Sequence, residues 1–312
     1  RLAELELRRR ARDVADRRRV PARPPFRPLS VDRPSRRQRD VNTAVSRLGS
    51  ALLSSYFVAL AVFLYIPLVV LVVFAFDNST IQTLPWSGFT TKWFHNAFSN
   101  GDLVAALERS GVIAAINAIL ATLLGLITAV AMTARKLALR GVVTALVLLP
   151  LVIPYVVLAV GMLILLNWLG LRQALWAVLL GHVVVSVPYS LLIILPRLRT
   201  LDASIVDAAL DLGASMFTAF RRITLPLIVP ALLSSALIAF TISFDEFAIA
   251  SFLVPAGKET YPVYVYTGAR TPALEPQVIA LGAVVVIAAL VIVTAAEAWR
   301  THAERRLRVG TP

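Results

Sequence analysis

The sequence predicts an all-α polytopic membrane protein, and three observations point to that fold class. Hydrophobic residues make up 58% of the 312 residues, and the mean hydropathy is +0.77, which is too apolar for a soluble domain. Six apolar segments are each long enough to form a transmembrane helix. The basic residues gather in alternate connections between these segments, which is the charge pattern of a multi-pass membrane protein.

The six predicted spans follow one another between residues 51 and 300. The first should remain as an anchor, because it is longer than a signal-peptide core and no small-residue cleavage pattern follows it. The third contains Pro150 and Pro154, and we expect these prolines to break its helix. The predicted spans are Ala51–Phe76, Leu107–Met132, Gly141–Trp168, Ala174–Leu195, Leu227–Leu253 and Gln277–Trp299.

Residues 1–50 form a basic N-terminal tail and linker. This tail holds 15 of the 31 basic residues and 6 of the 18 acidic ones, so it carries +9 of the formal net charge of +13. Its arginine runs either attract anionic lipid or belong to a solvated extension that fixes the orientation. The Pro/Arg-rich part at residues 21–39 should lack regular structure. Residues 301–312 form a second, C-terminal tail.

The positions of the arginines predict which side of the membrane each connection faces. Both tails, the loop before the third span and the region with Arg197, Arg199, Arg221 and Arg222 are basic, whereas the opposite loops carry few basic residues. Cytoplasmic loops carry the excess of Lys and Arg. We therefore expect both termini and the stretch 202–226 to be cytoplasmic.

The stretch 202–226 lies between two spans but is too short and too polar to cross the membrane itself. Asp202 can cap a short helix, Gly213 can end it in a left-handed conformation, and Pro226 can open the next apolar segment. So short a helix is not stable alone, and its alanines allow another surface to approach closely, as for a helix in a groove. Its predicted contact face consists of Ile205, Ala208, Ala209 and Leu212.

The spacing in this stretch resembles the EAA loop of the membrane subunits of binding-protein-dependent ABC importers. The matching positions are Asp207, Ala208, Ala209, Gly213, Ile223, Leu225 and Pro226. The resemblance implies that the loop is a coupling helix, which docks into a cleft on a cytoplasmic ATPase. The family usually has Glu where this chain has Asp207, so the carboxylate reaches one methylene less far. The alternative is a loop that only rests on the bilayer surface.

Asp245 and Glu246 are the most informative polar residues inside a predicted span. A carboxylate at membrane depth is costly, so it should face a partner, a wet cavity or the interior of the bundle. Two interpretations are open. One or both carboxylates attract an ammonium-bearing substrate along its pathway, or they form a structural ion pair, for example with Arg109.

Three further strings are similar to the second permease of spermidine/putrescine-type importers. They are LYIPLVVLVVFAFDNS, SFDEFAIASF and the stretch leading into GARTPALEPQVIALGAVVV. This resemblance covers most of residues 50–300 and implies the six-helix fold of type I ABC importer permeases in the cell inner membrane. It also implies a heterodimer with a second permease, an ATPase dimer, and a periplasmic or lipid-anchored solute-binding protein. The implied solute is a polyamine or a related small cation, with opines, iron chelates and amino-acid derivatives as alternatives.

Two outer loops, residues 77–106 and 254–276, are rich in aromatic side chains. Aromatic residues near a membrane boundary are more often interfacial anchors than ligands. In an importer permease these loops are also where the solute-binding protein would land.

Sequence motifs for enzymatic chemistry are missing. No G-x-x-x-x-G-K-[ST] loop occurs, so ATP and magnesium are expected on the partner ATPase and this chain is expected to hold no cofactor. There is no cysteine, and His95, His182 and His302 are too far apart in sequence to indicate a metal site. An ion-coupled secondary transporter acting through Asp245 and Glu246 is the rival class. It would show internal repeats and leaves the stretch 202–226 unexplained.

Overall fold

The computed structural model describes residues 36–80, 85–133, 139–271 and 274–309. The arginine runs of the N-terminal tail lie outside the described residues. The chain divides into two compact units, Arg1–Leu64 and Tyr65–Pro312. Helices dominate both, and within the described ranges the only strand-like contact is one isolated bridge between Asp77 and Phe89.

The first predicted span corresponds to helix α2 (Arg36–Phe74). The helix begins upstream of the predicted start and takes in the end of the stretch expected to lack regular structure. Pro34 is the last proline before it, so nothing beyond that point prevents a helix. Its apolar part, Leu52–Phe74, has a mean hydropathy of 3.0, and none of its most apolar window is buried. A helix of this length and hydropathy suits the interior of a bilayer.

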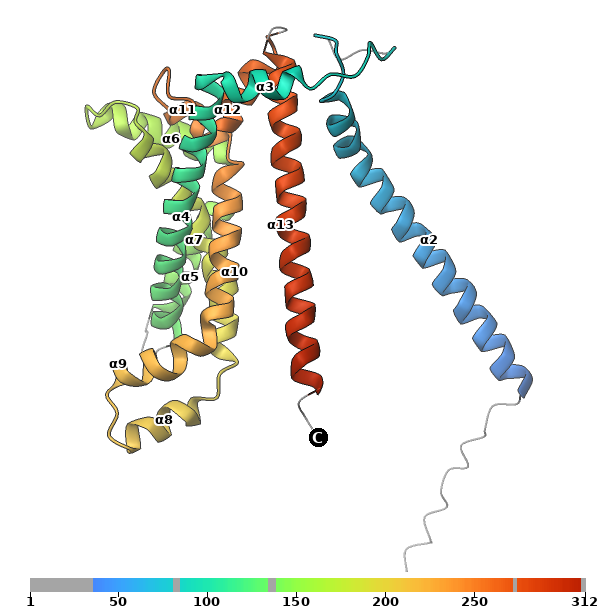
Figure 1. The fold of residues 1–312 in the computed structure, drawn as a ribbon. Coiled ribbons are helices and arrows are strands. Elements are labelled where there is room, and N and C mark those ends of the chain that lie inside the picture. The colour runs from blue at the N-terminus through green and yellow to red at the C-terminus, as the bar shows by residue number, and fades with distance from the viewer. Residues whose placement is uncertain (1–35, 81–84, 134–138, 272–273, 310–312) are drawn as a thin grey trace, which may run out of the picture. The chain divides into compact units, whose positions relative to one another are not determined.

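Three helices of the second unit form its core: α4 (Gly101–Thr133), α7 (Leu175–Arg199) and α10 (Leu225–Phe244). They lie side by side (Figure 1). The Asn117 amide on α4 donates hydrogen bonds to the Ser186 hydroxyl on α7 (2.9 Å) and to the Ala239 carbonyl on α10 (2.8 Å). A buried polar group that is satisfied in this way ties all three helices together.

Gly125 allows α4 and α7 to approach each other closely. A Cβ atom at this position would lie 2.5 Å from the Cβ of Ser190, which is far inside van der Waals contact. We expect Gly125→Ala to lower the free energy of unfolding by about 1–3 kcal/mol through overpacking. Gly111 in the same helix has nothing within 4 Å of such a Cβ, so Gly111→Ala should be neutral or stabilising. Denaturant unfolding in detergent checks the pair, and equal stability of the two variants would contradict the packing.

The third predicted span is a bent pair of helices, as its prolines indicated. Helix α5 (Arg140–Leu148) continues into a short 3-10 turn at Leu149–Leu151, and α6 (Tyr155–Trp168) follows after the break. The two parts are bent by 101°. The break predicted at Pro150 and Pro154 is therefore confirmed.

The fifth predicted span is not the single helix expected over Leu227–Leu253. Helix α10 ends at Phe244, and a separate short helix, α11 (Ala248–Leu253), begins after three residues in another conformation. No proline or glycine marks this break. At its other end α10 follows without a gap from α9 (Met216–Ala219) and a π-helical turn, η2 (Phe220–Thr224). The wider turn removes the clash that a proline ring at Pro226 would otherwise make with the carbonyl four residues earlier.

By length and hydropathy, four helices within the described residues are able to cross a membrane, and the bent pair makes a fifth. The sixth predicted span corresponds to α13 (Glu275–Val309), whose described apolar part is the shorter stretch Glu275–Val291. The chain is thus an all-α polytopic membrane protein, as predicted.

Two short helices, α3 (Lys92–Ser99) and α12 (Tyr261–Gly268), lie with α11 at one end of the α4/α7/α10 core. Helices α8 (Ala203–Asp211) and α9 lie at the opposite end (Figure 1). Trp93 on α3 is buried, and its indole N–H donates to the Asp77 carbonyl over 2.8 Å. Trp93 therefore packs in the interior of the unit. It is neither an interfacial anchor nor a ligand, the two roles expected for the aromatic residues of this loop.

Candidate functional site

The stretch 202–226 folds as the sequence predicted at its first helix. The Asp202 carboxylate accepts a hydrogen bond from the backbone N–H of Ser204 over 2.9 Å and caps α8. Gly213 ends the helix region with φ +86°, a left-handed conformation in which other residues are strained. Cap, helix and glycine stop together give α8 defined ends although it is short.

Helix α8 and the turn after it expose an apolar surface at the end of the core. Ala208 is exposed, and the Leu212 side chain is 90% exposed. Contiguous exposed apolar surface of this kind marks an interaction site. The other large apolar side chains exposed here are Ile205, Met216 and Phe217.

A cavity of about 580 Å³ lies between α8 and the ends of the core helices. It is lined by Val130 and Thr133 of α4, Leu198 at the end of α7, and Val206 and Asp207 of α8. Asp207 is exposed and borders the hollow between α8 and the helix ends, whereas Ala208, also exposed, does not line it.

The last three predicted coupling residues lie outside α8. Ile223 belongs to the π-helical turn, and Leu225 and Pro226 form the first turn of α10. π-helical turns inside α-helices are often found at functional sites. These residues join the exposed helix to a core helix, so a displacement of α8 would reach α10 through them.

The cap on α8 gives a test of its local stability. Hydrogen bonds from the backbone N–H and then the hydroxyl of Ser204 lower the pKa of Asp202 below its ordinary value of 3.8. The cap is therefore fully present above that value and is lost as the pH falls through the lowered pKa. Asp202→Ala should speed hydrogen exchange of the first α8 amides about five-fold, whereas Asp202→Asn keeps an acceptor and should change it little. Unchanged exchange rates of these amides in Asp202→Ala would contradict the cap.

The break between α10 and α11 separates the two adjacent carboxylates. Asp245 is exposed, whereas Glu246 is only 6% exposed. A cavity of 460 Å³ opens at the break. Besides the two carboxylates it is lined by Tyr155, Thr241, Ile242, Phe247 and Ala248. A carboxylate beside aromatic rings suits an ammonium group, because the ring faces also attract cations.

Glu246 has its partners within the protein. Its carboxylate accepts hydrogen bonds from the backbone N–H groups of Ile249 (2.9 Å) and Ala250 (3.1 Å). The Nε2 atom of His182 on α7 lies 3.3 Å from its Oε2. The partner suggested from the sequence, Arg109, lies elsewhere and donates from Nε to the Glu259 carbonyl over 2.9 Å. Glu246 therefore faces His182 on α7 and is not paired with Arg109.

His182 was missed by the sequence reasoning, which considered histidines only as metal ligands. It is 2% exposed and touches a carboxylate from another span. A histidine and a glutamate inside apolar segments both need polar partners. This requirement could have predicted that His182 and Glu246 lie near each other. Among the residues whose side chains are described, no group of His, Asp and Glu is arranged to hold a metal ion.

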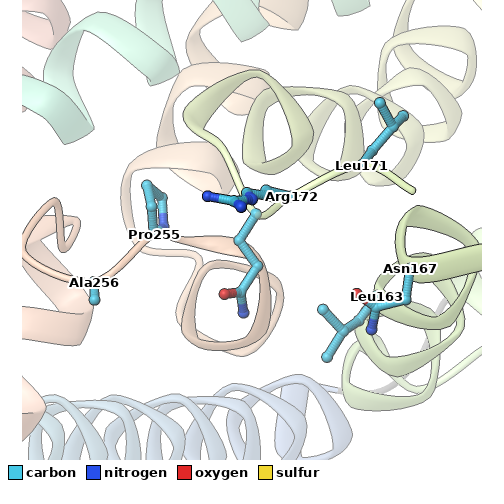
Figure 2. Close-up of a pocket in the computed structure, with 7 residues that line it drawn as sticks. Leu163, Asn167, Leu171, Arg172, Pro255 and Ala256 are labelled. Carbon is cyan, nitrogen blue, oxygen red and sulfur yellow. The ribbon is translucent and has the colours of Figure 1, made fainter. Parts of the chain in front are cut away.

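A third cavity, of 480 Å³, lies at the end of the core that carries α11 and α12. Figure 2 shows Leu163 and Asn167 of α6 on one side of it and Pro255 and Ala256 on the other. Arg172 lines it as well, and the neighbouring Gln173 amide donates to the Phe252 carbonyl over 2.7 Å. The cavity thus joins the α6–α7 connection to the predicted outer loop 254–276.

Comparison with known protein families identifies the family of this chain. Residues 121–309 match the family described as binding-protein-dependent transport system inner membrane component. The chain belongs to this family. As an inner membrane component it is a multi-pass transport subunit and not an enzyme, and it works together with a solute-binding protein.

Two permeases of Escherichia coli (strain K12) are similar to this inner membrane component over most of its length. The spermidine/putrescine transport system permease protein PotC is 32% identical over 250 residues, which cover 80% of this chain and 94% of PotC. The putrescine transport system permease protein PotI is 36% identical over 236 residues, which cover 72% of this chain and 81% of PotI.

Solved structures confirm the fold of the inner membrane component. A chain of a bacterial ABC transporter involved in the import of the acidic polysaccharide alginate superposes with a TM-score of 0.66 at 20% identity. The match covers 86% of this chain and 99% of the other. At this identity the likeness establishes the fold alone, which is that of an ABC importer permease.

Proposed function

We propose that this inner membrane component forms half of the translocation pathway of an ATP-driven importer for polyamines or related small cationic solutes. The observation that carries the solute class is the exposed carboxylate of Asp245, in a cavity with Tyr155 and Phe247. The names of PotC and PotI, which are similar over most of this chain, support the same class.

The energy for transport comes from a separate ATPase, which binds ATP and magnesium. The exposed apolar surface around Ala208 and Leu212 is the contact that we assign to it. Arg221 and Arg222, which are exposed just after this surface, support a cytoplasmic location of this end of the core under the positive-inside rule. Both chain ends then lie on the cytoplasmic side as well.

The coupling is mechanical. ATP binding draws two ATPase subunits together, and α8 moves with the subunit to which it is docked. A short turn joins α8 to α9, and α9, η2 and α10 then follow one another without a gap. A movement of α8 is passed along these helices to the carboxylate cavity at the far end of α10. ATP and the loaded solute-binding protein shift the equilibrium towards the outward-open state only if both bind that state better than the inward-open one.

The remaining surfaces are assigned to the other partners. The solute-binding protein, periplasmic or lipid-anchored, docks on the end that carries the cavity of Figure 2 and the loop 254–276. A second permease completes the pathway, because a single set of helices lines only one side of it.

Uptake into liposomes tests the proposal. The transporter is reconstituted with its ATPase, second permease and solute-binding protein, and labelled spermidine, putrescine and a neutral solute of similar size are compared. We expect uptake of the amines that requires ATP on the ATPase side of the membrane. Uptake confined to the neutral solute, or amine uptake without ATP, would contradict the proposal.

A further inference from the structure

The break between α10 and α11 is held by contacts to one histidine of α7. The Nδ1 atom of His182 lies 2.7 Å from the Ser243 hydroxyl, in the last turn of α10. Its Nε2 atom lies 3.3 Å from Oε2 of Glu246, after the break. If Ser243 donates to Nδ1, the ring proton is on Nε2 and faces the carboxylate. One imidazole therefore touches the chain on both sides of the break.

The neighbouring glycine brings α7 against the start of α11. A Cβ atom at Gly181 would lie 2.5 Å from Cγ2 of Ile249, so only a glycine permits this approach. The Glu246 carboxylate accepts the backbone N–H groups of Ile249 and Ala250, which the first turn of a helix otherwise leaves unpaired. These contacts fix Glu246 facing the protein interior.

The orientation of Glu246 determines that of its neighbour. With Glu246 turned inward, Asp245 is exposed and borders the cavity that contains Tyr155 and Phe247. His182 is buried and does not border this cavity. Any effect of His182 on a solute therefore passes through the residues of the break, among which Asp245 and Glu246 border the cavity.

We propose that His182 is a positioning residue for the passage of the solute. Through Ser243 and Glu246 it fixes the α10–α11 break and thereby holds the Asp245 carboxylate in the cavity. This inference rests on the proposed function, in which Asp245 attracts an ammonium group.

Removal of the imidazole should release the break. Without His182 the buried Glu246 keeps only backbone partners, and a carboxylate so poorly compensated is costly in the interior. The break then changes its conformation, and Asp245 is displaced from the cavity. A glutamine at position 182 still offers one N–H donor and one carbonyl acceptor, so His182→Gln should keep the arrangement.

A thiol probe in the cavity measures this displacement. Thr241→Cys places a single thiol among the residues that line the cavity, in a chain without cysteine. The assembled transporter is treated with a cationic and an anionic methanethiosulfonate reagent, and the modification of this subunit is followed by mass spectrometry. The ratio of the cationic to the anionic rate reports the negative potential of the cavity.

We expect Asp245→Asn to lower this ratio about ten-fold, because one nearby charge is removed. His182→Ala should lower it by a similar factor, and the double variant should show no further drop, since both act through one carboxylate. His182→Gln should keep the ratio. Asn117→Ala removes another buried polar group that links α7 and α10, so it should lower stability and leave the ratio unchanged.

An unchanged or raised ratio in His182→Ala, or an equal further drop in the Asp245→Asn background, would overturn the inference. If His182→Ala does not assemble, Ser243→Ala removes one of the two contacts of the imidazole and should lower the ratio about three-fold; no change there would also overturn it. The ratio does not depend on which solute is carried. Failure of amine uptake by the wild-type transporter would therefore count against the proposed function separately.

Discussion

Replacing Gly213 with valine should abolish ATP-driven uptake while the subunit still inserts and assembles. Gly213 has φ +86°, and a left-handed conformation costs a residue with a side chain about 1–2 kcal/mol, more when the residue is β-branched. There is open space around the position, with nothing within 4 Å of an added Cβ. The effect of the substitution is therefore on the backbone that ends α8 and not on packing.

The matched control for this prediction is Gly213→Asn. Asparagine tolerates the left-handed conformation better than other residues, so this variant should retain most of the uptake. Uptake and ATP hydrolysis are measured on the same reconstituted transporter. Full uptake in Gly213→Val would show that the shape of this turn is not needed for coupling.

Asp245→Asn should reduce uptake of a polyamine ten-fold or more and leave the level of the subunit in the membrane unchanged. The side chain is exposed in the cavity beside aromatic rings, so its loss leaves the fold intact. Hydrogen bonds to charged groups contribute about 1.5–3 kcal/mol, which corresponds to at least a ten-fold change in rate when they act in the limiting step. Initial rates with saturated solute-binding protein isolate the permease step.

Asp102→Asn is the control for this second prediction. Asp102 is an exposed carboxylate in the first turn of α4 and does not border the cavity, so its neutralisation should leave uptake unchanged. An equal loss in both variants would indicate a general effect of surface charge. No loss in Asp245→Asn would remove the carboxylate from the pathway.

The sequence was sufficient to predict the elements whose cause is local. The cap at Asp202, the left-handed Gly213 and the break near Pro150 each depend on a residue type with a strong conformational preference of its own. The structure has these features at the predicted positions. The apolar segments were equally predictable, because span length and hydropathy are properties of composition.

The features that were missed depend on contacts between distant segments. The break after Phe244 contains no proline or glycine, and it is stabilised by His182 from another helix. The sequence did not distinguish Asp245 from Glu246, whereas in the structure Asp245 is exposed at the cavity and Glu246, which also borders it, is buried against His182 of α7. Neither fact follows from periodicity, since the segment reads as a continuous apolar helix.

Cross-linking of α8 to the ATPase is the most direct test of the central claim, that a separate ATPase drives this subunit through the stretch 202–226. Ala208 is exposed on α8, and the chain has no cysteine, so Ala208→Cys introduces a single thiol into this subunit. In the assembled transporter, with one cysteine on the rim of the ATPase cleft, we expect an oxidative cross-link whose yield changes when ATP is added. Absence of the cross-link, together with labelling of the thiol by an impermeant reagent from outside the cell, would contradict the claim.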